Sequence, residues 1–260
     1  MIKNKAEKQS MKKLFIILSI TLITNIWAGP ETFDHLSQYK QSQVKEKGPS
    51  EEIVYSGDNN KEAHAVYSYN DKNQLIKASY FLNDKFDGYT EYIYSKENLV
   101  EEKLFNNKKN LIEIIKYEYD KKNRIKSYKV SQELNKNTNV IEWTFQYNND
   151  KLISGSRSID KEITETFVNQ NEKDSTNIIQ DIFTAEGEKM AFFRYVYQDN
   201  ILVKKIRNEN TGIKRVDYEY DDKNRIIKIF FYEVKSEKER LIKTHVLRYT
   251  SAIKTSLNKG

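Results

Sequence analysis

From residue 51 onward, apolar and polar residues alternate in short runs that are separated by polar turns. In the stretch 215–220, Val216, Tyr218 and Tyr220 occupy alternate positions and therefore share one face of an extended strand. Charged residues occupy the positions between them, and the stretch 141–147 alternates in the same way. This pattern indicates antiparallel strands with one face buried and the other face in water.

Pairs of aromatic residues two positions apart recur along the chain. The first members of successive pairs are separated by 25, 25, 28, 50 and 23 residues, and a weaker copy between Phe167 and Phe183 fills the widest gap. A fixed period of this length is typical of repeat architectures. The pairs are Tyr67/Tyr69, Tyr92/Tyr94, Tyr117/Tyr119, Phe145/Tyr147, Tyr195/Tyr197 and Tyr218/Tyr220.

A polar turn follows each pair, as in Asp120–Asn123 and Asp221–Asn224. Asn73, Asn98, Asn123 and Asn224 each stand four residues after the second tyrosine. Asn adopts the left-handed conformation more readily than other non-glycine residues, so it can close a short hairpin.

We therefore predict an all-β fold, an antiparallel meander of about 15 strands in ~25-residue repeats. So many strands cannot lie flat, so the sheet should curve strongly, either as an open superhelical sheet or as a barrel-like one, with its aromatic face inward.

The segment before the repeats reads as an export signal. Residues 11–13 carry positive charge, residues 14–27 are mostly apolar, and Ala28 suits a cleavage site. We predict a signal peptide over residues 1–28, with either Met1 or Met11 as the true start. Residues 29–50 are expected to form one short N-terminal helix and a connector, and residues 51–260 the β-repeat domain.

Removing the signal peptide changes the charge of the chain. Residues 1–28 contain five lysines and one glutamate, so the formal net charge falls from +6 for the whole chain to +2 for residues 29–260. The basic character therefore lies largely in the part that export discards. A nucleic-acid partner is not expected on this balance.

The two clearest turns resemble a known family. Tyr117–Ile125 and Tyr218–Ile226 follow the pattern Tyr-x-Tyr-Asp-x-x-Asn-Arg-Ile, which is similar to the YD repeats of bacterial RHS proteins and teneurins. Asn123 and Asn224 stand where that family usually has Gly. The resemblance implies a spiral antiparallel sheet lined by tyrosines, here as a short isolated array without a toxin domain.

Catalytic motifs are missing from the sequence. There is no cysteine, and His35, His64 and His245 lie far apart, without the spacing of a metal site. Asp120 and Asp221 recur in the repeat, and recurring residues usually serve a turn rather than a single active site. We therefore expect no catalytic residue, no cofactor and no metal.

The aromatic ladder is the candidate ligand surface. Its rings either form the core or line a concave face that stacks on a carbohydrate or contacts a cell-surface protein. The candidate ligand-facing residues are Tyr92, Tyr94, Tyr117, Tyr119, Trp143, Tyr147, Tyr195, Tyr197, Tyr218 and Tyr220.

Three functions fit these observations. The first is an exported, non-enzymatic repeat protein of the bacterial envelope or exterior, a binding or structural module that stays in solution without detergent. The second is an outer-membrane β-barrel, which export and strand number favour but outward Arg215, Asp217 and Glu219 oppose. The third is a secreted hydrolase that uses an undetected pair of carboxylates.

Overall fold

The computed structural model describes residue 40 and residues 46–132, 140–209, 212–235 and 238–250. The predicted signal peptide lies outside these ranges, as does most of the predicted N-terminal helix. Residues 46–50 are described and are not helical. No helix in the described ranges is both long and apolar enough to cross a membrane.

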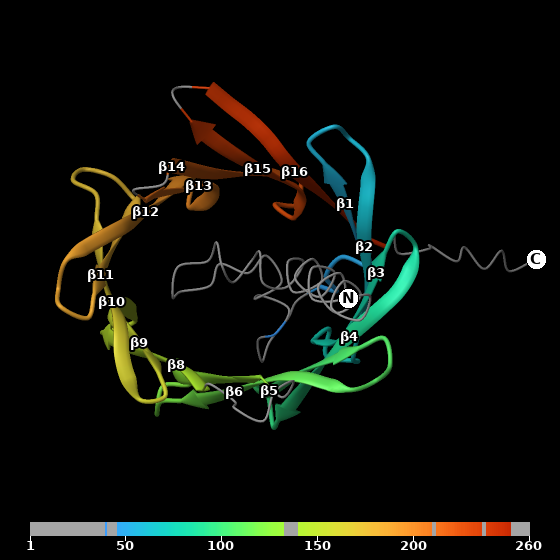
Figure 1. Cartoon of the computed structure of the whole chain (residues 1–260), viewed down its shortest axis with the longest axis horizontal. Helices are drawn as coiled ribbons and strands as arrows, with labels where there is room; N and C mark the ends of the chain where they lie inside the picture. Colours follow the sequence, from blue (N-terminus) through green and yellow to red (C-terminus); the bar gives the residue numbers. More distant parts are fainter. Residues whose placement is uncertain (1–39, 41–45, 133–139, 210–211, 236–237, 251–260) are drawn as a thin grey trace, which may run out of the picture.

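Sixteen antiparallel strands form a single sheet that closes on itself as a barrel (Figure 1). Each strand pairs with its neighbours in sequence, and β1 pairs with β16 to complete the ring. The strands are β1 Glu51–Ser56, β2 Lys61–Tyr69, β3 Leu75–Leu82, β4 Lys85–Ser95, β5 Asn98–Asn106, β6 Leu111–Tyr119, β7 Ile125–Gln132, β8 Val140–Asn148, β9 Lys151–Ile159, β10 Glu162–Asn171, β11 Ile178–Thr184, β12 Lys189–Gln198, β13 Ile201–Glu209, β14 Gly212–Tyr220, β15 Ile226–Lys235 and β16 Lys238–Arg248.

These strands confirm the predicted all-β meander and decide between its two forms, because the sheet is a closed barrel. The strand count exceeds the expected number by one. The stretch from Phe167 to Phe183, read as a weak repeat, forms the paired strands β10 and β11.

The two faces of the sheet differ in composition. Tyr67, Tyr80, Phe193 and Phe231 are buried and share one face with small residues such as Ala65. The opposite face carries most of the charged strand residues and the most exposed apolar ones. A closed barrel can cover only its inner face with its own side chains, so the buried aromatic face is the inner one.

Turns alternate between the two ends of an antiparallel meander. The turns that join an even-numbered strand to the next strand lie at one end, here called the tyrosine rim, because the second tyrosine of each pair precedes them. The start of β1 and the end of β16 lie at this rim as well. The other end, with turns such as 83–84 and 107–110, is called the opposite rim.

Candidate functional site

In five of the six aromatic pairs, the second tyrosine fastens its hairpin to the segment before it, and Tyr249, just after β16, makes the same kind of contact. Each of these hydroxyls donates a hydrogen bond to a backbone carbonyl that lies 18–23 residues earlier in the chain. Each bond joins neighbouring segments at the tyrosine rim and satisfies the tyrosine hydroxyl. The pairs are Tyr69 with Pro49 at 2.8 Å, Tyr94 with Leu75 at 2.9 Å, Tyr119 with Leu99 at 2.8 Å, Tyr147 with Ile125 at 2.9 Å, Tyr220 with Leu202 at 2.6 Å and Tyr249 with Ile226 at 3.0 Å.

A register shift in the sheet positions these rings. The pairing shifts immediately before Tyr69, Tyr94, Tyr119, Tyr147 and Tyr220. A β-bulge places two residues of one strand opposite one residue of its partner, and it turns the next side chain. In each case the extra residue lies on the following strand, which bends at the level of the tyrosine.

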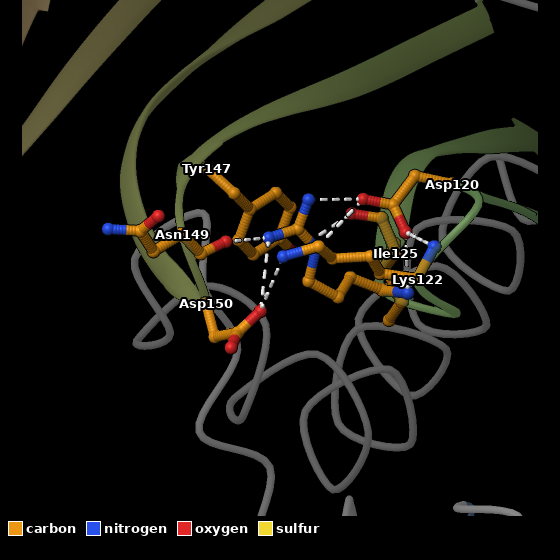
Figure 2. A network of polar contacts seen from close by, with 7 residues as sticks. Asp120, Lys122, Ile125, Tyr147, Asn149 and Asp150 are labelled. Carbon is orange, nitrogen blue, oxygen red and sulfur yellow. Dashed lines mark hydrogen bonds and ion pairs between the residues drawn. The ribbon is translucent and has the colours of Figure 1, made fainter.

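The aspartate of the repeat holds the turn together (Figure 2). Asp120 Oδ1 accepts hydrogen bonds from the backbone N–H groups of Lys122 at 2.8 Å and Arg124 at 3.0 Å. Asp120 Oδ2 lies 2.8 Å from Arg124 Nε and 2.6 Å from Arg124 Nη2. The backbone N–H and the guanidinium of Arg124 hold the pKa of the Asp120 carboxyl below its ordinary value.

Arg124 extends this turn to the next hairpin. Its guanidinium lies over the ring of Tyr147, 4.4 Å from the ring centre, and donates to the carbonyl of Asn149 (Figure 2). Asp150 follows in the same turn, with Oδ1 3.7 Å from Arg124 Nη1.

The second copy of the motif repeats the contacts within the turn and with the ring. Arg225 pairs with Asp221 at 2.6 Å and lies over the ring of Tyr249 at 4.3 Å. Two copies far apart in the chain thus make the same contacts, so the motif serves the architecture of the rim.

Asparagine closes the turns at most of the predicted positions. Asn73, Asn123 and Asn224 have φ angles of 62°, 66° and 58°, as their tolerance of the left-handed region predicts. The prediction for Asn98 is wrong. The connection from Tyr94 to its strand partner Leu99 is one residue shorter than the connection from Tyr69 to Leu75. Lys96 therefore takes the positive φ of 57°, and Asn98 begins β5 opposite Ser95.

The first tyrosine of three pairs bonds a polar side chain on the inner wall. Tyr67 donates to Glu52, Tyr117 to Glu102 at 2.7 Å, and Tyr195 to Gln180 at 3.3 Å. In each case the acceptor lies 15 residues earlier, on the preceding strand. Sequence reasoning missed these acceptors, although their spacing from the tyrosine is constant and could have revealed them.

Two of these acceptors also meet a basic group. His245 Nδ1 of β16 contacts Glu52 across the β1–β16 seam, and both side chains are almost fully buried. Lys40 Nζ lies 3.0 Å from Glu102 Oε1 and 5.0 Å from the centre of the Tyr92 ring. These polar groups of the inner wall are thus held by direct partners.

All ten candidate ligand-facing aromatics lie on the inner face. Tyr92 and Tyr195 are buried, and Tyr94, Tyr117, Tyr119, Trp143, Tyr147, Tyr197, Tyr218 and Tyr220 are half-buried. Tyr94, Tyr119, Tyr147 and Tyr220 belong to the hydroxyl–carbonyl series described above. Their placement fits the core interpretation, and the ligand role stays a prediction.

The outer wall carries ion pairs between neighbouring strand residues. Lys129 pairs with Glu142 at 3.5 Å, and Arg215 with Asp217 at 3.1 Å. Lys228 on β15 pairs with Glu219 on β14 at 3.1 Å. Arg215, Asp217 and Glu219 thus face outward, as their alternation with the tyrosines predicts. In the described part of the chain, no group of three or more His, Cys, Asp or Glu side chains is placed to hold a metal ion.

Comparisons with known proteins bear on the fold alone. No family model matches the chain, and no curated protein matches it. A porin-like protein from Bacteroides uniformis aligns over 78% of this chain and 96% of its own, with a TM-score of 0.51 and 10% identity. A structure described as TcdB2-TccC3-TEV aligns over 71% of this chain and 13% of its own, with a TM-score of 0.29 and 10% identity. The chain therefore shares its barrel fold with a porin-like protein, and the YD-repeat assignment stays a prediction.

Proposed function

We propose that this chain is an outer-membrane β-barrel of the bacterial cell envelope, with a binding or structural role rather than a catalytic one. The observation that carries the proposal is the closure of β1 on β16 through six consecutive residue pairs. A closed barrel pairs the backbone groups of every strand within the sheet, which is the condition for crossing a bilayer with strands. The fold likeness to a porin-like protein supports the same assignment.

Strand length and the outer apolar residues add support. Twelve strands have nine to eleven residues, and a tilted strand needs about 9–11 to span a bilayer. Apolar side chains on the outer wall remain exposed, among them Val66 at 41%, Phe86 at 41% and Val168 at 47%. Exposed apolar side chains of this size suit a surface that faces lipid.

The outer ion pairs favour a second candidate, an exported barrel in water that serves as a binding or structural module. An Arg or Lys on the lipid face costs about 2–4 kcal/mol at the bilayer midplane. Arg215 and Lys129 lie in the middle of β14 and β7 and face outward, so a bilayer would have to cover both. Pairing with Asp217 and Glu142 lowers this cost without removing it.

Purification of the full chain with and without detergent tests the proposal. The outer-membrane assignment predicts that the protein needs detergent or lipid to stay dispersed and that it reconstitutes into vesicles. It also predicts that the vesicle-bound protein resists extraction by carbonate and urea. A monodisperse barrel in detergent-free buffer that does not bind vesicles would favour the second candidate.

A further inference from the structure

A carboxylate in the middle of the inner wall is paired with a residue that does not belong to the wall. Glu102 lies halfway along β5, faces inward beside Tyr92 and is 8% exposed. Its direct neighbours across the sheet are Tyr92 on β4 and Ile115 on β6, neither of which is charged. Lys40 precedes β1 and belongs to none of the sixteen strands, yet its ammonium lies 3.0 Å from Glu102 Oε1. The cation at Glu102 therefore approaches from the interior of the barrel.

The surroundings of this ammonium suit the recognition of an amine. Glu102 supplies the negative charge and is oriented by a hydrogen bond from the Tyr117 hydroxyl at 2.7 Å. The ring of Tyr92 faces the ammonium, which lies 5.0 Å from the ring centre. A carboxylate and the face of an aromatic ring both attract an ammonium group, and together they fix its position. The side chain of Lys40 is only 16% exposed, so the amine is held in an enclosed place.

Two other repeats show the same arrangement with a basic group that is built into the wall. Glu52 and Gln180 correspond to Glu102, because each also accepts a hydrogen bond from a tyrosine 15 residues later. The basic group beside Glu52 is His245 of β16. The basic group near Gln180 is Lys205 of β13, whose ammonium lies 5.3 Å from the centre of the ring of that tyrosine. In both repeats a strand provides the basic group, whereas at Glu102 a residue from outside the sheet provides it.

We propose that Glu102, Tyr92 and Tyr117 form a binding site for the ammonium group of an alkylamine, and that Lys40 occupies this site as an internal ligand. An amine from solution displaces the lysine and meets the same carboxylate and the same ring. The site lies on the inner wall, so it stands or falls separately from the question of whether lipid or water surrounds the barrel.

Butylammonium is the probe, because it is the lysine side chain without its backbone. Its binding to the full chain in detergent is measured by saturation-transfer NMR for the wild type, K40A and K40A/E102Q. K40A removes the internal ligand, and E102Q removes the charge that attracts the amine. The glutamine side chain can still accept the hydroxyl of Tyr117, as Gln180 accepts that of Tyr195, so the double variant isolates the effect of the charge.

K40A should bind butylammonium about tenfold more tightly than the wild type, in which the lysine competes, and than the double variant, which lacks the carboxylate. No preference for K40A over K40A/E102Q would overturn the site. No preference for K40A over the wild type would overturn the role of Lys40 as its occupant. Butanol, the neutral analogue, should not distinguish the three proteins, and the same preference for butanol would overturn recognition of the charge. K40S is read in the same way and replaces K40A if that variant does not fold.

Discussion

At the scale of single residues, the second tyrosine has the same physical task in five of the six aromatic pairs. It buries its ring on the inner wall and donates its hydroxyl to a carbonyl of the preceding hairpin. Alternation in the sequence predicts the inward ring, because residues two apart share a face. It could not predict the carbonyl partner, because that requires the bulge and the register of two adjacent hairpins.

Removing the hydroxyl of Tyr147 should destabilise the barrel. Y147F keeps the ring beneath Arg124 but removes the 2.9 Å bond to the carbonyl of Ile125. We expect a loss of about 1 kcal/mol in the free energy of unfolding, the usual net value of such a bond. Denaturant titration in detergent measures it.

Tyr232 provides the matched control for this substitution. Its ring also lies beneath an arginine, 4.3 Å from Arg215, but its hydroxyl makes no hydrogen bond among the described residues. Y232F should therefore leave the free energy of unfolding nearly unchanged. Equal effects of the two substitutions would refute the role assigned to the Tyr147 hydroxyl.

The Asp120 carboxylate should contribute stability only while it is charged. Its folded pKa lies below the ordinary value of 3.8, so its contribution is present above that value and is lost as the pH falls through the folded pKa. Unfolding titrations from pH 7 to pH 2 should show that the difference in the free energy of unfolding between the wild type and D120N becomes smaller in acid. D58N, at an exposed turn of the opposite rim, is the control. A difference between the wild type and D120N that is as large at pH 2 as at pH 7 would contradict the prediction.

At the scale of elements, the hairpin that ends at the tyrosine rim is the repeating unit. Aspartate holds the turn, asparagine closes it, and arginine reaches the ring of the next hairpin. The turn chemistry was predictable from Asp120–Asn123 because it is local. Asn98 shows where this local prediction fails. The β4–β5 connection is one residue shorter than the β2–β3 connection, and the positive φ falls on Lys96 instead.

The β1–β16 seam should depend on one buried carboxylate. Glu52 contacts His245 on β16 and Tyr67 on β2. E52A removes the carboxylate that both side chains contact, and we expect a loss of about 3–5 kcal/mol in the free energy of unfolding, as for other broken buried pairs.

The neighbouring residue on the same strand gives the comparison. Glu51 faces outward and pairs at 3.2 Å with Arg248, whose side chain is 60% exposed. E51A should cost about 0–1 kcal/mol, as exposed pairs do. A seam that tolerates E52A as well as E51A would show that backbone pairing alone holds β1 to β16.

At the scale of the whole molecule, the sequence predicts the strands better than their closure. Alternation and a period near 25 residues give the all-β meander, because these are local properties. Closure depends on Glu51–Ser56 meeting Lys243–Arg248, nearly 200 residues later, and on the curvature that all the strands accumulate. The contact between Glu52 and His245 was missed for the same reason, because it appears only once β1 and β16 are in register.

Some residues of the outer wall favour an outer-membrane barrel, and others favour a barrel in water. Exposed Val66, Phe86 and Val168 suit lipid, whereas Lys129 and Arg215 suit water. The balance of these residues along the barrel decides how much of the wall a bilayer can cover.

Fractionation of the native cell tests whether the chain resides in the outer membrane. Inner membrane, outer membrane, periplasm and medium are separated, and the chain is followed with an antibody alongside a marker for each compartment. We expect the protein to sediment with the outer membrane and to stay there after washing with carbonate and urea. Recovery in the periplasm or the medium without detergent would contradict it.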